Sequence, residues 1–413
     1  MTLFEDLAAL NRAQWAAFIA AVLGWTLDAF DFFLMAFMVK AIAHDFHAQI
    51  ADVFVCVAMT LMLRPFGAFF FGWLAEKYGR RPILMIDVLL FAGLEVASAF
   101  APSLPVLLVL RALFGFAMGG EWGIGASLVM ESIPARSRGA VSGILQQGYP
   151  LGYLLASVAY GFLFDTIGWR GLFIVGVIPA FLVIFIRLFV KESPVWEKAH
   201  GQGTHRTGLI AALARNWKTF FYVILLMTAF NFFSHGTQDI YPTFLQVQRG
   251  LSTHQVSAIL IVMNIGAIIG GLTFGFWSQH IGRRRAIIIA SLLALPIIPL
   301  WAFSTTPFLL GLGAFLLQVA VQGAWGVIPA HLNELSPAEV RGTFPGFAYQ
   351  LGNFFASYNT VLQASMAKTY GGNYGLALAI VLAAAALSIT VIAALGREAR
   401  EAHFAGTITP SDS

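Results

Sequence analysis

Ionisable side chains that interrupt long apolar runs are the residues of this sequence that could do chemistry. At the depth of a membrane such a group costs about 2.5–3.5 kcal/mol on insertion scales, so its presence there indicates a function. These residues are Asp28, Asp31, Arg64, Glu95, Arg111, Glu121, His235 and Asp239. Buried carboxylates and histidines can exchange protons near neutral pH, and the planar guanidinium of arginine matches a carboxylate. The residue types therefore indicate the binding of protons and of an organic anion.

The spacing of the polar residues places them on shared helix faces. Asp28 and Asp31 are three residues apart, which puts both carboxylates on one side of a helix. Four further stripes are Asn231, His235, Gln238 and Asp239; Gln146, Tyr149 and Tyr153; Gln318 and Gln322; and Gln350, Asn353 and Ser357. Any one of these amides could simply tie two helices together. As a collection on several helices, they predict a shared polar cavity.

Pro242 predicts a break beside one of these stripes. Proline has no N–H group, so the carbonyl of Gln238 loses its helical partner and the helix should kink or loosen there. Broken backbone beside ionisable residues is a common way to expose groups to a substrate.

The elements that position these residues must be membrane-spanning helices. The chain has 59% hydrophobic and 11% charged residues, whereas a soluble protein needs roughly a quarter of its residues charged. We count about twelve mostly apolar segments of roughly 20 residues, the length that crosses a bilayer. Because backbone polar groups in lipid must be satisfied internally, the expected fold is all-α with twelve transmembrane helices. The expected spans begin near Trp15, Asp52, Pro82, Pro105, Arg138, Trp169, Trp217, Thr253, Arg285, Pro307, Gly342 and Asn373.

The basic residues predict the orientation of these helices. With the N-terminus inside, most arginines and lysines fall in cytoplasmic loops, and only four fall on the opposite side, namely Lys40, Arg170, Arg249 and Lys368. We therefore expect both termini to be cytoplasmic and the protein to lie in a bacterial inner (plasma) membrane. Basic residues confined to short loops do not indicate nucleic-acid binding. The single cysteine, Cys56, excludes an intramolecular disulfide.

Three motifs recur at one offset. GWLAEKYGRR begins at Gly72 and resembles GFWSQHIGRR at Gly275; ESIPARSRGAVSG begins at Glu131 and resembles ELSPAEVRGTFPG at Glu334, and both 275 − 72 and 334 − 131 are 203. EWG and AWG match at the same shift. The chain is therefore expected to contain a six-helix bundle in residues 1–191, a cytoplasmic linker in 192–216, a second bundle in 217–397 and a cytoplasmic tail in 398–413. Two such repeats with a site between them are typical of alternating-access carriers.

The loop from Gly72 to Arg81 resembles the signature of the major facilitator superfamily. The first copy has Glu76 in its acidic position and the second has Gln279. The resemblance implies that these loops lock the cytoplasmic side when the carrier opens outward, although basic loops could also serve only to set topology. The gating residues that it implies are Gly72, Glu76, Gly79, Arg80, Arg81, Glu131, Arg138, Gly275, Gly282, Arg283, Arg284, Glu334 and Arg341.

A second resemblance concerns substrate. NFFSHGTQDIYPT, residues 231–243, fits every fixed position of the pattern Asn-x-x-Ser/Thr-His-x-Ser/Thr-Gln-Asp-x-x-x-Thr. This pattern is typical of lactate and pyruvate proton symporters in the sialate:proton symporter branch, and DAFDFF, LRPFGAFFFG and KESPVWE are similar to that branch too. The resemblance implies proton-coupled symport of lactate- or pyruvate-like short-chain monocarboxylates. It assigns substrate-handling or ionisable positions to Arg64, His235, Asp239, Gln350 and Asn353, and the polar stripes add Asn231, Gln238 and Tyr149.

The expected roles follow from chemistry. Arg64 is the candidate for the substrate carboxylate, because its fork permits bidentate pairing and it stays charged. Arg111 is expected to brace a helix contact, since Gly115 and Gly119 share its stripe. The proton-coupling candidates are Asp28, Asp31, Glu121, His235 and Asp239. Ala324 stands at the repeat position of Glu121, so the duplicated scaffold does not require that acid.

Other functions remain as alternatives. Sialic acid carriers of the same branch resemble fourteen-span proteins, and the short polar linker 192–216 leaves no room for two more spans, which favours a smaller acid. A membrane enzyme would need a motif such as HExxH, GxSxG or paired cysteines, and none is present. The gate-like loops and the duplicated halves disfavour a channel, and no soluble signalling domain is seen in the sequence to favour a sensor with a transporter fold. We expect no cofactor and no metal, a small organic carboxylate and a proton as ligands, contact with membrane lipid, no nucleic acid, and a monomer.

Overall fold

The computed structural model describes residues 10–48, 50–201, 209–337, 340–341 and 343–399. Parts of the expected linker (202–208) and tail (400–413), and the expected start of the eleventh span at Gly342, lie outside the described residues. In the described part of the chain every regular element is a helix. The all-α prediction is therefore confirmed.

The first group of helices runs from α2 to α9. Its members are α2 (Arg12–Asp45), α3 (Ile50–Tyr78), α4 (Arg80–Ala99), α5 (Leu104–Met118), α6 (Glu121–Ser132), the short 3₁₀ turn Ala135–Ser137, α7 (Arg138–Gln146), α8 (Gly148–Val175) and α9 (Ile178–Phe189). Two short helices follow, α10 (Pro194–Gly201) and α11 (Leu209–Arg215). Helix α8 is interrupted at Gly168, whose φ of 63° is a value that glycine adopts readily. This interruption is the boundary between the fifth and sixth expected spans.

The second group runs from α12 to α20. Its members are α12 (Trp217–Gln238), α13 (Tyr241–Thr243), the π-helix Phe244–Gln248, α14 (Thr253–Ile281), α15 (Arg283–Phe303), α16 (Pro307–Trp325), α17 (Ile328–Leu335), α18 (Phe344–Ala356), α19 (Asn359–Thr369) and α20 (Tyr374–Leu395). Helix α12 ends at Gln238, and the next helix, α13, begins at Tyr241 and contains Pro242. The expected break at Pro242 is present.

Ten segments of the described chain are long and apolar enough to cross a membrane. The two remaining expected spans are made of paired helices, α7 with α8 and α18 with α19, and these carry the polar stripes around Tyr149 and Asn353. Large apolar side chains such as Phe162, Phe308 and Leu395 are 76–80% exposed on the outside of the helices. Exposed apolar side chains are favourable in contact with lipid and unfavourable in contact with water.

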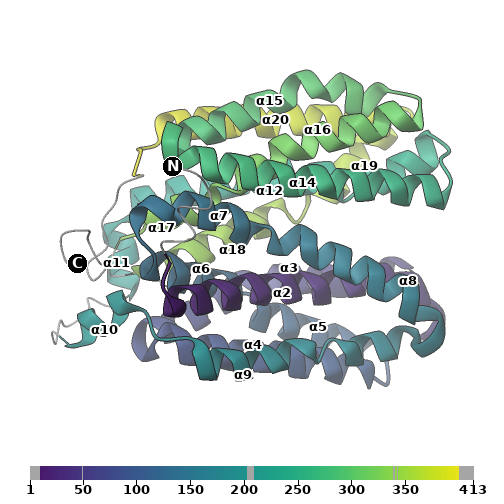
Figure 1. Cartoon of the computed structure of the whole chain (residues 1–413). Helices are drawn as coiled ribbons and strands as arrows, with labels where there is room; N and C mark the ends of the chain where they lie inside the picture. Colours follow the sequence, from purple (N-terminus) through teal and green to yellow (C-terminus); the bar gives the residue numbers. More distant parts are fainter. Residues whose placement is uncertain (1–9, 49, 202–208, 338–339, 342, 400–413) are drawn as a thin grey trace.

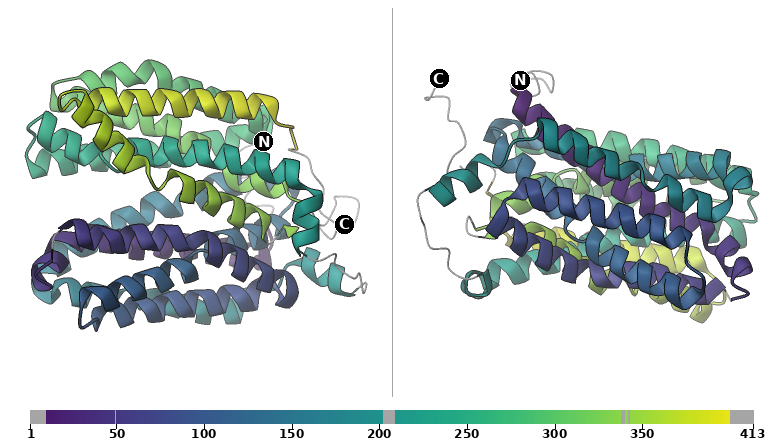
Figure 2. Two further views of the ribbon diagram at one scale, coloured as in Figure 1. Left: turned by 180° about the vertical axis from the view of Figure 1, so that it is seen from behind. Right: turned by 90° about the horizontal axis from the view of Figure 1, so that it is seen from below.

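The two groups of helices lie side by side, close together at the end that holds both termini and further apart at the other end (Figures 1 and 2). At the close end glycines permit direct backbone contact. A Cβ added to Gly123 would lie 2.6 Å from the Cα of Gly346, and one added to Gly72 would lie 2.8 Å from the Cα of Thr343. Because both pairs join the first group to α18 or its N-cap, the groups are packed backbone to backbone at that end.

Candidate functional site

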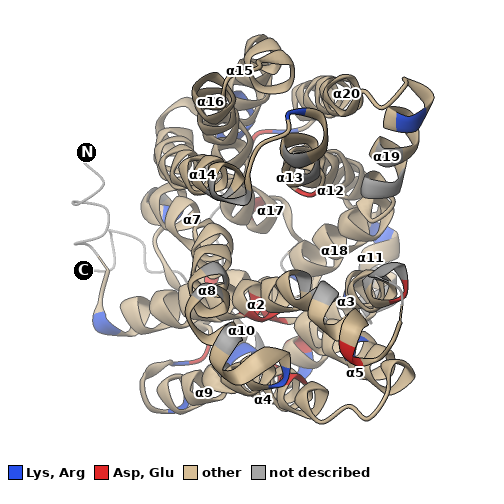
Figure 3. Ribbon diagram, turned by 90° about the vertical axis from the view of Figure 1, so that its right-hand side faces the viewer, with Lys and Arg blue, Asp and Glu red and all other residues tan. Residues whose placement is uncertain are grey.

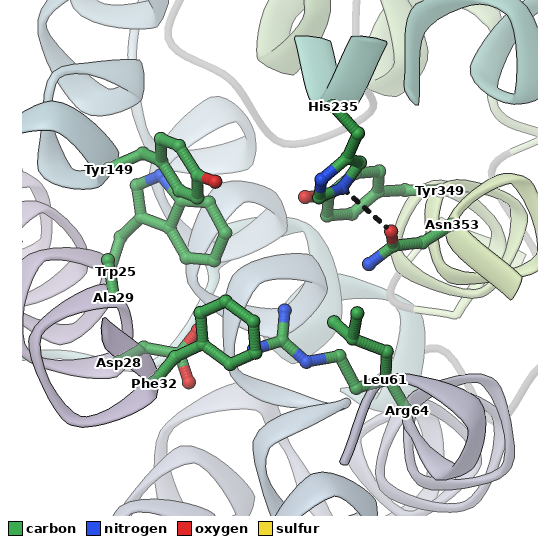
Figure 4. A pocket seen from close by; sticks show the side chains of 10 residues that line it. All are labelled: Trp25, Asp28, Ala29, Phe32, Leu61, Arg64, Tyr149, His235, Tyr349 and Asn353. Atoms are coloured by element: carbon green, nitrogen blue, oxygen red, sulfur yellow. Dashed lines mark hydrogen bonds between the residues drawn. The ribbon is translucent and has the colours of Figure 1, made fainter. Parts of the chain in front are cut away.

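A pocket with about 290 Å³ of empty space lies between the two groups of helices (Figure 4). Helices α2, α3 and α8 contribute one side and helices α12 and α18 the other. Its lining residues are Trp25, Asp28, Ala29, Phe32, Leu61, Arg64, Tyr149, His235, Tyr349 and Asn353. Five of the predicted site residues, from both halves of the chain, therefore meet in one place: Asp28, Arg64, Tyr149, His235 and Asn353.

Arg64 is the cation of this pocket. Its side chain is buried, with only 5% of the residue exposed, and its Nη2 lies 2.7 Å from the sulfur of Met118 while its Cζ lies 5.0 Å from the ring centre of Phe32. Its Nε has no hydrogen-bond partner, and no ion pair within 4.0 Å is recorded for it in the described chain. A buried guanidinium without a carboxylate partner is costly, so a bound anion would stabilise it.

The backbone of α3 around Arg64 is fixed by glycines of α5. A Cβ added to Gly119 would lie 2.1 Å from the carbonyl oxygen of Arg64, and one added to Gly115 would lie 2.0 Å from that of Thr60. The two helices can therefore touch along their backbones, which holds the start of the Arg64 side chain in place. This is the close contact predicted from the glycine stripe.

Arg111 lies elsewhere and has partners. Its Nη2 is 2.7 Å from Glu95 Oε2 and 2.6 Å from Ser98 Oγ, and its guanidinium lies over the rings of Phe114 and Phe173. This is the structural role expected of Arg111, and it accounts for Glu95 as well.

His235 faces Arg64 across the pocket. Its Nδ1 lies 3.2 Å from Asp239 Oδ1 and its Nε2 lies 3.1 Å from Asn353 Oδ1, while Asn353 Nδ2 donates to Gln350 Oε1 at 3.4 Å (Figure 4 shows the bond to Asn353). Both ring nitrogens thus meet oxygen acceptors, and only a doubly protonated imidazole donates from both nitrogens. The arrangement can hold a proton on His235 and can present the Asn353 amide to a substrate.

The predicted acids divide into two sets. Asp28 lines the pocket, and Glu121 is buried behind it with 1% of the residue exposed. Asp31 is also buried, but it lies towards Glu95: a Cβ added to Gly176 would be 2.3 Å from Glu95 Cγ and 3.1 Å from Asp31 Oδ1. Figure 3, seen from the end away from the termini, shows the acidic positions of α2 near the centre of the molecule.

Five lining residues and one buried acid were missed in the sequence. Trp25, Phe32 and Tyr349 line the pocket, with Trp25 and Tyr149 stacked at 6.0 Å between ring centres, and Leu61 and Ala29 complete the wall. Aromatic residues in an apolar helix have no pattern that separates pocket walls from lipid contacts. The missed acid is Asp87 in α4, which is 0% exposed, and a single carboxylate within the run ILMIDVLLF was the signal that could have found it.

Three predicted substrate residues lie outside the pocket lining. Asn231 donates to the carbonyl of Met227 in its own helix at 2.9 Å, and Gln238 donates to Gln318 at 3.3 Å. Gln350 touches the site only through its bond to Asn353. The contacts of Asn231 and Gln238 are both hydrogen bonds to the protein itself, as expected if these amides only hold helices in place. Contact of Asn231 or Gln238 with a substrate stays a prediction.

The end of the molecule that holds the termini carries a network of ion pairs. Arg80 lies 3.2 Å from both Glu76 and Glu131, and Arg283 lies 2.9 Å from Glu334. These pairs are buried and occupy the same place in the two halves of the repeat. The pairs with Glu131 and Glu334 join the starts of α4 and α15 to the ends of α6 and α17.

Carboxylates also cap two helix N-termini in this network. Glu192 accepts from the backbone N–H groups of Arg80 and Arg81, and Glu398 accepts from those of Arg283 and Arg284, at 2.9–3.2 Å. Gly79 and Gly282 precede these helices with φ of 106° and 99°, a conformation that favours glycine. Negative charge at a helix N-terminus is stabilising.

Several contacts of this network cross between the halves. Gln279 Oε1 accepts from the N–H of Gly139 at 3.2 Å and from Arg283 at 2.8 Å, and Ser127 Oγ donates to the carbonyl of Arg341 at 2.8 Å. Gly275 lies against Gly143, where an added Cβ would be 2.5 Å from its Cα. Arg138 is fully buried at the start of α7. The predicted gating residues therefore lie at or beside the end where the two groups of helices are close together.

His331 in α17 is fully buried, and neither of its ring nitrogens has a hydrogen-bond partner. The helix α17 that carries it is buried along its whole length, so the imidazole is enclosed rather than exposed. Among the described residues no group of three or more His, Cys, Asp or Glu is arranged to hold a metal ion.

The sequence profile of the Major Facilitator Superfamily matches residues 20–357. The chain belongs to this superfamily. The solved structure of the proton:xylose symporter XylE has a TM-score of 0.79 to this chain, with 20% identity and coverage of 95% of this chain and 98% of that one. The human organic anion transporter MFSD10 has a TM-score of 0.69 with 15% identity, covering 93% and 100%. These likenesses confirm the major facilitator fold, and membership of the superfamily makes the chain an integral membrane protein of the transporter class.

Three proteins that are similar in sequence are named as transporters. A carboxylic acid transporter protein homolog of Saccharomyces cerevisiae is 28% identical over 88% of this chain, which spans 63% of the length of that protein. A probable 4-methylmuconolactone transporter of Cupriavidus pinatubonensis is 31% identical, with 84% and 82% covered. The sialic acid transporter NanX of Escherichia coli is 26% identical, with 94% and 95% covered.

Proposed function

We propose that this protein is a secondary active transporter that carries a lactate- or pyruvate-like monocarboxylate together with a proton. The observation that carries the proposal is Arg64, a buried guanidinium that forms no ion pair with a carboxylate of the described residues and lines the pocket between the two groups of helices. The named substrates of several relatives, a carboxylic acid, cis,cis-muconate and sialic acid, support an organic acid as the class.

The pocket offers complementary groups to such a substrate. Arg64 pairs with the carboxylate through its fork, and the facing His235 and Asn353 hydrogen-bond the hydroxyl or keto oxygen of a 2-hydroxy or 2-keto acid. The proton is held on the acids around Asp28 or on the His235–Asp239 pair, which lie on opposite sides of the same pocket. One proton and one monovalent anion moving together carry no net charge.

Alternating access requires the two halves to move against each other. We take residues 1–191 and 217–397 as the moving units, 192–216 as their linker and 398–413 as the tail. The contacts that join the halves at the terminal end, such as Gly139 N–H with Gln279 and Ser127 with the carbonyl of Arg341, would have to separate for the pocket to open to that side. The ion pairs of Arg80 and Arg283 each lie within one half and would brace that half as it moves. With both termini cytoplasmic in a bacterial inner membrane, this end is the cytoplasmic gate, and the protein works as a monomer.

Purified protein in liposomes tests the proposal. An inward proton gradient should drive accumulation of L-lactate, and a valinomycin-imposed potential without a pH gradient should not. Accumulation driven by potential alone would contradict one-to-one symport, and no uptake of lactate or pyruvate under any gradient would contradict the proposed substrate.

A larger organic acid is the second candidate, because the muconolactone and sialic acid transporters are as similar in sequence as the carboxylic acid transporter homolog. The short polar linker 192–216, which leaves no room for two further spans, favours the smaller acid. A thermal-shift screen with lactate, pyruvate, acetate, cis,cis-muconate and sialic acid at two pH values separates the candidates. Stabilisation by sialic acid alone would favour the alternative.

A further inference from the structure

We propose that Gln363 is a positioning residue for the candidate site: it holds the backbone at the broken end of α12 and thereby fixes where the His235 side chain lies. The inference rests on the proposed function, because it takes His235 as a residue that contacts the substrate. It concerns a residue of α19 that neither the polar stripes nor the motifs of the sequence indicated.

The break after α12 leaves a buried backbone carbonyl without a helical partner. Helix α12 ends at Gln238, and the last carbonyls of a helix have no N–H group one turn further on. The carbonyl of His235 still accepts from the N–H of Asp239 at 3.1 Å, whereas no backbone N–H group of the described residues donates to the carbonyl of Gly236. Because Gly236 is buried, its carbonyl needs a partner from a side chain.

Gln363 supplies this partner. It is 0% exposed, and its Nε2 donates to the carbonyl of Gly236 at 2.8 Å. A carbonyl can only accept, so the contact sets the orientation of the amide and leaves Oε1 to accept from Asn359 Nδ2 at 3.5 Å, one turn earlier in α19. A Cβ added to Gly236 would lie 3.3 Å from Val381 Cγ1 and 3.5 Å from Gln363 Nε2. The glycine therefore lets α12 lie close against α19 and α20 at this point.

Two successive residues of α12 are held by the two pieces of one broken span. Helices α18 and α19 are separated by a break, as α12 and α13 are. His235 contacts Asn353 in α18 at 3.1 Å, and the next residue, Gly236, contacts Gln363 in α19. The two contacts together set both the position and the rotation of the end of α12.

Both hydrogen bonds of the His235 ring depend on where its backbone lies. The ring nitrogens are 3.2 Å from Asp239 Oδ1 and 3.1 Å from Asn353 Oδ1, near the upper end of the usual range for such bonds. A small displacement of the backbone would therefore lose one of them. Gln363 holds the peptide group that directly follows His235, so it limits this displacement without lining the pocket itself.

Gln318 of α16 is a buried amide on the same stretch of α12 and provides a comparison. It is 1% exposed, donates to Thr237 Oγ1 at 3.0 Å and accepts from Gln238 at 3.3 Å. These contacts join side chains to side chains, so rotation of the side chains can compensate for their loss. A buried amide that only ties helices together should behave as Gln318 does.

Concentration-dependent uptake by proteoliposomes tests the proposal, with L-lactate, pyruvate and cis,cis-muconate as probes. Gln363→Met removes the hydrogen bond at similar volume, so the half-saturation concentration should rise about fivefold, the size expected for one neutral hydrogen bond. The maximum rate per folded protein should change less than about twofold. Loss of a merely structural contact would lower the melting temperature or the yield and leave half-saturation unchanged. Gln318→Met, the matched control, should keep half-saturation within about twofold of wild type.

A double-mutant cycle separates an effect through His235 from an independent one. His235→Gln alone should raise the half-saturation concentration about tenfold, and Gln363→Met in that background should add less than about twofold, since the side chain that it positions is gone. An undiminished fivefold rise in the double variant, or wild-type half-saturation in Gln363→Met, would overturn the assignment. An equal rise in Gln318→Met would also overturn it, because any loosening of this end of α12 would then have the same effect.

If Gln363→Met does not fold, Gln363→Asn takes its place in the cycle. Its amide is one methylene too short to reach Gly236, so wild-type half-saturation in this variant would overturn the assignment equally. Failure of the proposed function gives a different result: the wild-type protein would transport none of the three acids. Transport of muconate alone by the wild type would contradict the proposed substrate and still allow the cycle to be measured.

Discussion

Arg64 and Arg111 are buried in the same half of the molecule, on helices that touch through glycines, yet they differ in their partners. Arg111 forms an ion pair with Glu95 at 2.7 Å and is enclosed by two phenylalanines, whereas Arg64 has a thioether, one aromatic ring and an open pocket beside it. A cation that already has its anion can only brace the structure. The comparison shows that the missing partner, rather than the buried charge itself, marks the candidate binding site.

The largest expected effect is the loss of uptake when Arg64, the arginine without an ion pair, is replaced. Arg64→Lys keeps the charge but loses the planar fork, so uptake of L-lactate should fall about 100-fold, as expected for lost hydrogen bonds between charged groups. The melting temperature in detergent should change little, because Arg64 has no ion pair to lose. Full transport by this variant would remove Arg64 from the site.

The next effect is on stability at Arg111. Arg111→Met leaves Glu95 buried without its cation, and the free energy of unfolding should fall by about 3–5 kcal/mol. Replacing both partners, as Arg111→Met with Glu95→Leu, should recover much of this loss, since no unpaired charge remains. Thermal denaturation of the two variants measures the difference. Equal instability of the single and double variants would argue against the ion pair as the main contribution of Arg111.

A smaller effect is expected on the opposite wall of the pocket. Asn353→Ala removes one hydrogen-bonding group from the substrate side of His235, so the half-saturation concentration for lactate should rise about tenfold. His235 also loses its contact at 3.1 Å, and the variant His235→Gln should show a comparable rise. Concentration-dependent uptake measures both, and unchanged half-saturation in Asn353→Ala would place the substrate nearer to Arg64 alone.

The smallest effect separates pocket residues from helix contacts. Gln238→Ala removes a bond to Gln318 and no residue of the pocket lining, so uptake should stay within about twofold of wild type. The same uptake assay, with Asn353→Ala alongside, checks this. A loss as large as that of Asn353→Ala would mean that Gln238 reaches the substrate in another conformation of the carrier.

Much of the fold could be predicted from the sequence because lipid leaves few solutions. Apolar runs of bilayer length must be helices, loops rich in arginine set the orientation, and repeated motifs at a fixed offset indicate two similar bundles. The break at Pro242 followed from one missing N–H group. The bracing role of Arg111 followed from the glycines on its stripe, whose close backbone contacts the structure shows.

The site was predicted less completely. Buried charges stand out in apolar helices, and this made Asp28, Arg64 and His235 visible. Asp87 stands out in the same way but had no stripe and no motif around it. Trp25, Phe32 and Tyr349 gave no signal, because the same aromatic residues also face lipid and pack in helix cores.

The sequence by itself determined that this chain places ionisable groups within twelve expected apolar spans and that its two halves share one plan. Residue type and spacing suffice for this, because an ionisable residue within an apolar run can be recognised without knowing which helix packs against it. Only the tertiary structure decided which charges are paired. Arg111 meets Glu95 and Arg64 meets a pocket because helices far apart in the sequence pack through glycines, and no local pattern specifies that packing.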